Sequence, residues 1–270
     1  MKKIIKNIFF VFCLFLARVS SFLGVSTHRP VVLLYHSVGN NDSKYTVSER
    51  DFIKQMNFLK KNKKVVSLSE LVEAVEKKEK TKNLVAVTID DGYFDSVDFV
   101  ARYNKELGFP PITVFLTTNL EQSDKLGGIK RPDKDDIVRT FNEESLIFEM
   151  HGHNHKPFRE ALGEGEESLK AEILDCQNKI FELTGYKSYF LAYPSGRQNE
   201  EIRNFIKNLG IKAGFGNNYG TISGNESMMS LPRVQVDKNT NFLLFKIRLS
   251  RAVDIAESIK NFFKKYGNRK

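Results

Sequence analysis

An apolar run at residues 84–89 ends in two adjacent acidic residues and a glycine, Asp90, Asp91 and Gly92. Adjacent residues that leave a strand point in different directions, so one carboxylate can bind a cation while the other faces a substrate. Gly92 permits a tight backbone turn at this point. The same residues also suit an ordinary turn in which an aspartate caps the following helix. The pair by itself therefore allows a divalent-cation site without requiring one.

Three of the five histidines in the chain lie within five residues, at His151, His153 and His155, directly after the apolar run 146–148. On a helical turn, His151 and His155 would lie on one side and His153 would face away. In an extended segment, His153 would instead pair with one of its two neighbours. Both arrangements bring two imidazoles to one ion, and together with the acidic pair they favour a metal site.

One carboxylate and two imidazoles supply three protein ligands and leave positions open, which is typical of catalytic rather than structural metal sites. Zn²⁺ suits these ligands, with Co²⁺, Ni²⁺ and Mn²⁺ as alternatives. Such an ion brings the pKa of bound water toward about 7 and polarises a carbonyl group. The second aspartate would then act as general base. His36 follows the apolar run 33–35 and is the candidate general acid that protonates a leaving amine.

Strand-like and helix-like segments alternate after residue 27, which indicates parallel strands joined by right-handed crossovers. The candidate polar groups each follow a strand, as they do at the C-terminal face of a (β/α) barrel. We therefore expect a single α/β domain over residues 28–270 with a distorted or incomplete (β/α) barrel, and a doubly wound open sheet as the second possibility. The polar segment 119–144 is expected to be a long loop. The expected strands are 31–35, 84–89, 112–116, 146–149, 189–193, 211–215 and 231–236, and helices are expected from Ser48, from Ser69 and over 96–107, 166–183, 199–209 and 254–265.

The first 27 residues differ in character from the rest. Lys2, Lys3 and Lys6 precede ten uninterrupted apolar residues, 8–17. Ten is too few for a membrane span, which takes about twenty, and fits the apolar region of a signal peptide. We expect residues 1–27 to be a signal or membrane-anchor segment and the protein to be exported or membrane-associated in the cell envelope. The alternative is a cytoplasmic protein, peripheral to the membrane, whose apolar N-terminus packs on its own body.

Composition narrows the function classes further. The formal net charge is +9, yet no Arg-rich helix or basic strand with interleaved aromatic residues stands out, which argues against a nucleic-acid partner. The two cysteines, Cys13 and Cys176, lie in an apolar stretch and in an expected helix, so a structural disulfide is not expected.

Four motifs in this order resemble those of the polysaccharide deacetylases, over about residues 30–240. Thr88-Ile-Asp-Asp-Gly92 resembles the family's Thr-Phe-Asp-Asp-Gly motif, and His151-Gly-His-Asn-His155 resembles its His-(Ser/Thr)-x-x-His motif. Leu191-Ala-Tyr-Pro-Ser-Gly196 is similar to a Phe-Ala-Tyr-Pro-Tyr-Gly form of the third motif. Leu33-Leu-Tyr-His-Ser-Val38 is similar to the Met-Tyr-His segment that opens the poly-N-acetylglucosamine deacetylases.

The resemblance implies a distorted (β/α) barrel and metal-dependent removal of N-acetyl groups from amino sugars of a cell-envelope or surface polysaccharide. It implies that Asp90 is the catalytic base and that Asp91, His151 and His155 hold the metal. It also implies that His36 supplies the acid, which other members take from a C-terminal Leu-x-x-His motif that this chain lacks.

The third motif implies that residues 194–196 shape the pocket wall and supply a backbone N–H to the oxyanion, with Tyr193, Pro194 and Gly196 as substrate-binding residues. The arginine often found in this motif is Ala192 here, so another residue must orient the base. Arg233 is the candidate for that role at the substrate-binding site.

Two other functions are compatible with the resemblance. One is a deformylase of a lipid-linked amino sugar, so the expected partner is an N-acetylated glycan or a lipid-linked sugar. The other is a catalytically silent module that binds glycan or membrane. The presence of Asp90, Asp91, His151 and His155 argues against silence.

Overall fold

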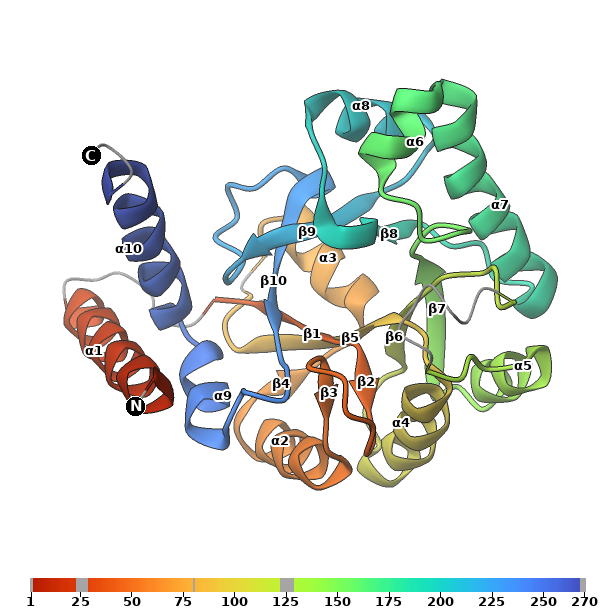
Figure 1. The fold of residues 1–270 in the computed structure, drawn as a ribbon. Coiled ribbons are helices and arrows are strands. Elements are labelled where there is room, and N and C mark those ends of the chain that lie inside the picture. Colours follow the sequence, from red (N-terminus) through yellow and green to blue (C-terminus); the bar gives the residue numbers. More distant parts are fainter. Residues whose placement is uncertain (1, 23–28, 80, 122–128, 268–270) are drawn as a thin grey trace.

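The computed structural model describes residues 2–22, 29–79, 81–121 and 129–267. Its centre is a closed barrel of seven parallel strands surrounded by helices (Figure 1). Around the barrel the strands follow the order β1-β10-β9-β8-β7-β6-β5, and the ring closes because β1 also pairs with β5. These strands are β1 (Val31–Tyr35), β5 (Leu84–Asp91), β6 (Ile112–Leu116), β7 (Leu146–Met150), β8 (Phe190–Ala192), β9 (Ala213–Tyr219) and β10 (Leu231–Gln235).

The expected distorted (β/α) barrel is confirmed, and the open doubly wound sheet is wrong. Every pairing between barrel strands is parallel. The short strand β4 (Lys64–Val65) pairs only with the start of β5, so it does not complete an eighth position of the ring. A small pair, β2 (Ser37–Val38) and β3 (Thr46–Val47), lies outside the barrel sheet.

Side chains of the barrel strands alternate between two cores. In β5, Val85 and Val87 face the surrounding helices, whereas Ala86 belongs to the cluster inside the barrel. Since successive side chains of a strand point to opposite sides, Asp90 lies on the same side of β5 as Ala86. Leu231 of β10 is likewise in the inner cluster, which puts Arg233 on the inner side as well. The alternation therefore directs Asp90 and Arg233 into the barrel interior, near the C-terminal ends of the strands.

Amphipathic helices cover the outside of the barrel. Ser48 caps α2 by accepting a hydrogen bond from the Asp51 N–H, as its spacing predicted. The helix expected from Ser69 begins at Leu68, because the side chain of Ser67 forms the capping box with Glu70. The helices are α1 (Lys2–Phe22), α2 (Glu49–Asn62), α3 (Leu68–Glu76), α4 (Phe94–Leu107), α5 (Lys134–Asn142), α6 (Phe158–Glu164), α7 (Glu166–Thr184), α8 (Glu200–Asn208), α9 (Phe242–Arg248) and α10 (Ala252–Gly267).

The expectation of a long loop over residues 119–144 is wrong, because α5 occupies its last part. Asp133 and Asp136 form a reciprocal capping box at the start of this helix. Its inner face buries Ile137 and Thr140. Only these two residues of α5 are buried, so the sequence of this helix shows too few apolar positions to reveal a helical repeat.

Helix α1 packs against the body of the protein. Phe10, Cys13 and Ala17 are buried in a cluster with residues of α9 and α10. Figure 1 shows α1 beside α10 at one flank of the barrel. Within the described residues, no helix has the length and apolar character needed to cross a membrane. The boundary predicted at residue 27 lies outside the described residues, and the signal or anchor role of residues 1–27 stays a prediction.

Candidate active site

Asp90 at the end of β5 is held by Arg233 from β10. The guanidinium donates two hydrogen bonds, from Nη1 to Oδ1 at 2.6 Å and from Nη2 to Oδ2 at 2.7 Å. Both side chains are almost completely buried. Arg233 also lies against the rings of Phe115 and Phe215. Burial would raise the pKa of Asp90, but Arg233 and the nearby imidazoles outweigh it and hold that pKa below its usual value.

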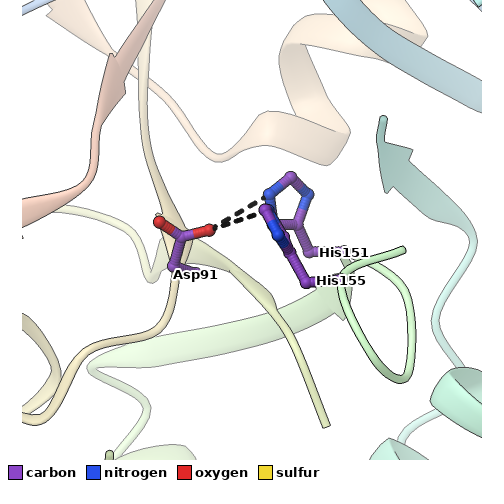
Figure 2. A group of neighbouring side chains, drawn as sticks. All are labelled: Asp91, His151 and His155. Atoms are coloured by element: carbon purple, nitrogen blue, oxygen red, sulfur yellow. Dashed lines mark ion pairs between the residues drawn. The ribbon is translucent and has the colours of Figure 1, made fainter. Parts of the chain in front are cut away.

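Asp91 meets two of the three clustered histidines. Its Oδ1 lies 3.3 Å from Nε2 of His151 and 3.4 Å from Nε2 of His155. Figure 2 shows both imidazoles directed at this one carboxylate, from the loop that follows β7. The three ligand atoms lie within 4.8 Å of one another. The structure therefore brings together the three residues expected to hold the metal.

The two histidines converge by loop geometry. Residues 151–157 are not helical, so the expectation of a helical turn is wrong although the pairing of His151 with His155 holds. Gly152 and His155 have positive φ values of 82° and 56°, which turn the chain back toward β5. On the opposite side, Gly92 also has a positive φ, and a Cβ there would lie only 2.6 Å from Cδ1 of Leu116.

His151 is fixed by the main chain of β8. Its Nδ1 lies 2.8 Å from the carbonyl oxygen of Ala192. A carbonyl only accepts, so Nδ1 carries a proton, and Nε2 is the ring nitrogen that faces Asp91 and that could bind an ion. A second ring nitrogen bonded in this way is the usual support for a metal-ligating histidine.

His153 belongs to a different set of contacts. Its Nδ1 lies 2.9 Å from Oγ1 of Thr118, and it is not a member of the three-residue cluster. The alternative His-x-His pairs are therefore not the ones that the structure forms.

A buried carboxylate on α7 holds the histidine loop. Glu172 accepts hydrogen bonds from the Asn154 N–H at 3.0 Å and from Asn154 Nδ2 at 2.7 Å. Its own main-chain carbonyl accepts from the His153 N–H at 2.9 Å. Glu172 Oε2 also lies 3.0 Å from where a Cβ on Gly152 would stand. Sequence reasoning missed this residue, because a glutamate within an amphipathic helix carries no signal of its own.

Asp91 has two further supports that the sequence did not reveal. Nη1 of Arg131 bonds the main-chain oxygen of Asp91, while Nη2 bonds that of Thr117. The pKa of Tyr93 is raised by burial and by its hydrogen bond to the Asp91 carboxylate. Arg131 comes from the polar segment that was expected to be a loop, and only its place in the fold gives it this function.

The charge state of the cluster suits a cation. Burial opposes ionisation of Asp91, but the hydrogen bond from His151 and the neighbouring imidazoles hold its pKa below the usual range. Burial and the proximity of His151 lower the pKa of His155 to about 4. The site therefore presents an ionised carboxylate and, at His155, a neutral imidazole, the forms in which these side chains bind metals.

The donor set also fits the size of a small divalent ion. Tetrahedral ligands about 2.1 Å from zinc are roughly 3.4 Å from one another. The distances from Asp91 Oδ1 to the two imidazole nitrogens, 3.3 and 3.4 Å, match that spacing. Asp91, His151 and His155 can thus hold such an ion with little rearrangement.

These groups line one wall of a cavity of about 610 Å³. His36 lines the same cavity, and its ring stacks on Tyr45 with centroids 4.8 Å apart. Its Nδ1 is buried and has no hydrogen-bond partner among the residues that the structure describes. His36 therefore lies in the same cavity as Asp90, Asp91, His151 and His155. The other lining residues are Leu34, Ser43, Tyr93, Ile129, Tyr193, Ser195, Gly196, Tyr219, Arg233 and Gln235.

The third motif forms part of the cavity wall. Tyr193 and Gly196 line the cavity, whereas Pro194 is buried and, within the described part of the chain, is not a lining residue. The N–H of Gly196 is donated to the Tyr193 carbonyl at 2.7 Å, and that of Tyr193 to Phe215 at 3.0 Å. Proline has no N–H. The N–H groups of Tyr193 and Gly196 are therefore used within the fold. A main-chain donor to an oxyanion from residues 194–196, of which Ser195 also lines the cavity, stays a prediction.

Comparison with known proteins agrees with this geometry. Residues 77–214, just over half of the chain, match the family model for polysaccharide deacetylase. YxkH of Bacillus subtilis (strain 168), which is named for the same family, is 23% identical over 217 residues, covering 78% of this chain and 74% of that protein.

Two solved structures share the fold. The Streptococcus pyogenes deacetylase PplD, in complex with acetate, superposes with a TM-score of 0.71 at 19% identity, over 83% of this chain and 99% of that chain. IcaB from Ammonifex degensii superposes with a TM-score of 0.70 at 20% identity, over 82% and 97%. The match to the family model begins directly after α3, ends at the start of β9 and includes both polar motifs at the barrel end. The chain therefore belongs to the polysaccharide deacetylase family and is an amide hydrolase.

Proposed function

We propose that this protein is a divalent-metal-dependent N-deacetylase of amino sugars in a cell-envelope or surface polysaccharide. The observation that carries the proposal is the position of Asp90 beside the metal-binding cluster. Its Oδ2 lies 3.9 Å from Nε2 of His151, yet Asp90 is bound by Arg233 rather than facing both imidazoles as Asp91 does. The site thus holds one carboxylate for the ion and a second carboxylate for the reaction.

Zn²⁺ is the ion that we propose, because one carboxylate and two imidazoles are its common ligands in catalytic sites. Co²⁺, Ni²⁺ and Mn²⁺ accept the same ligands. A bound ion would activate a water molecule and polarise the amide carbonyl of the substrate.

The residues around the cluster divide the proton transfers between them. Asp90 accepts the proton of the attacking water, and Arg233 keeps this carboxylate ionised until it does so. His36, in the same cavity, delivers a proton to the leaving amine. Burial of Asp90 and Arg233 limits competition from bulk water for the hydrogen bonds between them.

The cavity volume of about 610 Å³ lies in the range of about 300–1,000 Å³ that is typical of sites for small ligands. We propose that it accommodates one N-acetylated sugar unit of a glycan, in an exported or membrane-associated protein. A formylated, lipid-linked amino sugar has the same reacting amide and one methyl group less. Product analysis distinguishes the two.

The test is to measure acetate and formate release from chitooligosaccharides, peptidoglycan fragments and lipid-linked amino sugars, with the enzyme chelator-treated and then reloaded with each metal. We expect acetate release that is lost with the chelator and restored best by Zn²⁺. Formate release from the lipid-linked sugar alone would replace the acetyl substrate by the formyl one. Full activity after complete metal removal would refute the metal-dependent mechanism.

A further inference from the structure

The formal net charge of the chain equals the charge of two terminal segments, residues 1–22 and residues 258–270. Residues 1–22 and 258–270 contain nine Lys and Arg residues and no Asp or Glu. The rest of the chain contains 33 basic and 33 acidic residues, so these two segments account for the whole formal charge of +9. The rest of the chain, which includes the barrel, therefore has no formal net charge that the terminal segments would neutralise.

The same two helices expose most of the large apolar side chains at the surface. Of the ten exposed large hydrophobic residues in the described part of the chain, seven lie on α1 or α10. Phe12 and Phe15 are 52% and 61% exposed, and Phe262 and Phe263 are 59% and 66% exposed. The others on α1 are Ile8, Val11 and Val19.

The exposed apolar residues of α1 form one stripe, because their spacing of three and four residues keeps them on one side of the helix. The opposite side, with Phe10, Cys13 and Ala17, is buried against α9 and α10. Helix α1 is thus apolar on both sides, although only one side is covered by other parts of the described chain. A helix that is apolar all round is normally covered all round.

We propose that the exposed face of α1 and α10 is a docking surface for an anionic lipid membrane. Exposed apolar side chains flanked by lysines suit a helix that lies at the interface of such a membrane. The acidic residues of α10, Asp254 and Glu257, lie in its first half, before Phe262 and Phe263. A second copy of this chain would meet the same positive charge on its partner, which disfavours self-association through this face. An amphipathic helix of this kind lies parallel to the membrane surface.

Helix α10 connects the docking surface to the barrel. Nζ of Lys260 on α10 lies 5.8 Å from the ring centre of Phe10 on α1 and 5.6 Å from that of Tyr219. Tyr219 is the last residue of β9 and lines the cavity. Docking would therefore fix the barrel to the membrane through α10.

The test is cosedimentation of the full chain with vesicles of phosphatidylcholine alone and of phosphatidylcholine mixed with phosphatidylglycerol. We expect binding to the mixed vesicles only, and less binding as the salt concentration rises. Phe12→Ser with Phe15→Ser should weaken it at least tenfold. Phe181→Ser, which alters an equally exposed phenylalanine on α7 (55%), should leave it unchanged.

The electrostatic part is tested by Lys264→Gln with Lys265→Gln. At about 1 kcal/mol for each lysine near an anionic surface, the pair should weaken binding about 30-fold. Lys61→Gln with Lys207→Gln, two exposed lysines on α2 and α8, is the matched control. Acetate release from a soluble oligosaccharide should be the same for all these variants, which shows that they fold.

Three results would overturn the proposal. The first is equal binding to both kinds of vesicle, or to neither. The second is equal loss of binding in Phe181→Ser and in the α1 variant. The third is a lipid-free dimer in sedimentation velocity that Phe12→Ser with Phe15→Ser dissociates, because the face would then belong to a second copy. None of these results depends on the metal-dependent mechanism, so the two proposals fail separately.

Discussion

Arg233 on β10 donates hydrogen bonds to both carboxylate oxygens of Asp90 on β5. The two strands are separated by β1 in the barrel, so the contact crosses the barrel interior. Position 192, where related sequences often have an arginine, is occupied here by alanine. Asp90, the proposed base, is therefore oriented from a different strand of the barrel, by a bidentate contact.

Arg233→Gln should shift the acidic limb of the pH–rate profile to higher pH. The guanidinium lowers the pKa of Asp90, and the base works only when ionised, so loss of the charge raises the pH at which half of the enzyme is active. Arg233→Lys should restore part of the shift, whereas Arg102→Gln, at an exposed site on α4, should change nothing. An unmoved acidic limb in the folded Arg233→Gln variant would show that another group orients or replaces the base.

Asp90→Asn should lower kcat by about 10²- to 10⁴-fold, the usual contribution of a general base, with metal content near that of the parent enzyme. His155→Ala should lose both activity and metal. Metal analysis of the purified proteins and acetate release measure the two effects, and Asp175→Asn on the exposed side of α7 is the control. Normal kcat in Asp90→Asn would reject its assignment as the base.

Glu172→Gln should weaken metal binding about 10- to 100-fold, as loss of a residue that supports metal ligands does. A glutamine has only one oxygen to accept the two Asn154 hydrogen bonds, so the loop that carries His155 becomes less well held. Competition with a chromophoric chelator measures the affinity. Glu182→Gln alters an exposed glutamate on the same helix and should have no effect, while excess metal should restore the activity of Glu172→Gln.

His36→Ala should remove the basic limb of the pH–rate profile and leave metal content unchanged, because the proposed acid would be gone while the three ligands remain. His153→Ala is the matched control, since His153 bonds Thr118 outside the cluster. The profile of kcat against pH decides the matter. A basic limb that persists in His36→Ala would assign the acid to another group.

The elements that carry the site could be predicted because their signals are local. The run 84–89 is fully buried in β5, and the polar residues that follow it lie where a parallel barrel places them. The pairing of His151 with His155 was one of the open possibilities. Its geometry could not be predicted, because it depends on positive φ at Gly152 and His155, which the loop adopts only against its neighbours.

The supporting residues were beyond sequence reasoning for a different reason. Arg131 and Glu172 contact the site from segments 40 and 18 residues away along the chain, and neither stands in a recognisable motif. Arg233 was a candidate only because Ala192 cannot orient Asp90 as an arginine at that position would. A residue that acts through a distant partner becomes visible only when the barrel brings the two together.

His151 and His155 are held in place by different kinds of group, so the two positions differ in how sensitive they are to substitutions around them. His151 is hydrogen-bonded to the main-chain carbonyl of residue 192. Every amino acid has this group, so a substitution at position 192 leaves the hydrogen bond in place. His155 depends on a loop fastened by one glutamate side chain. Natural substitutions that alter the affinity for the ion should therefore accumulate around the loop that carries His155.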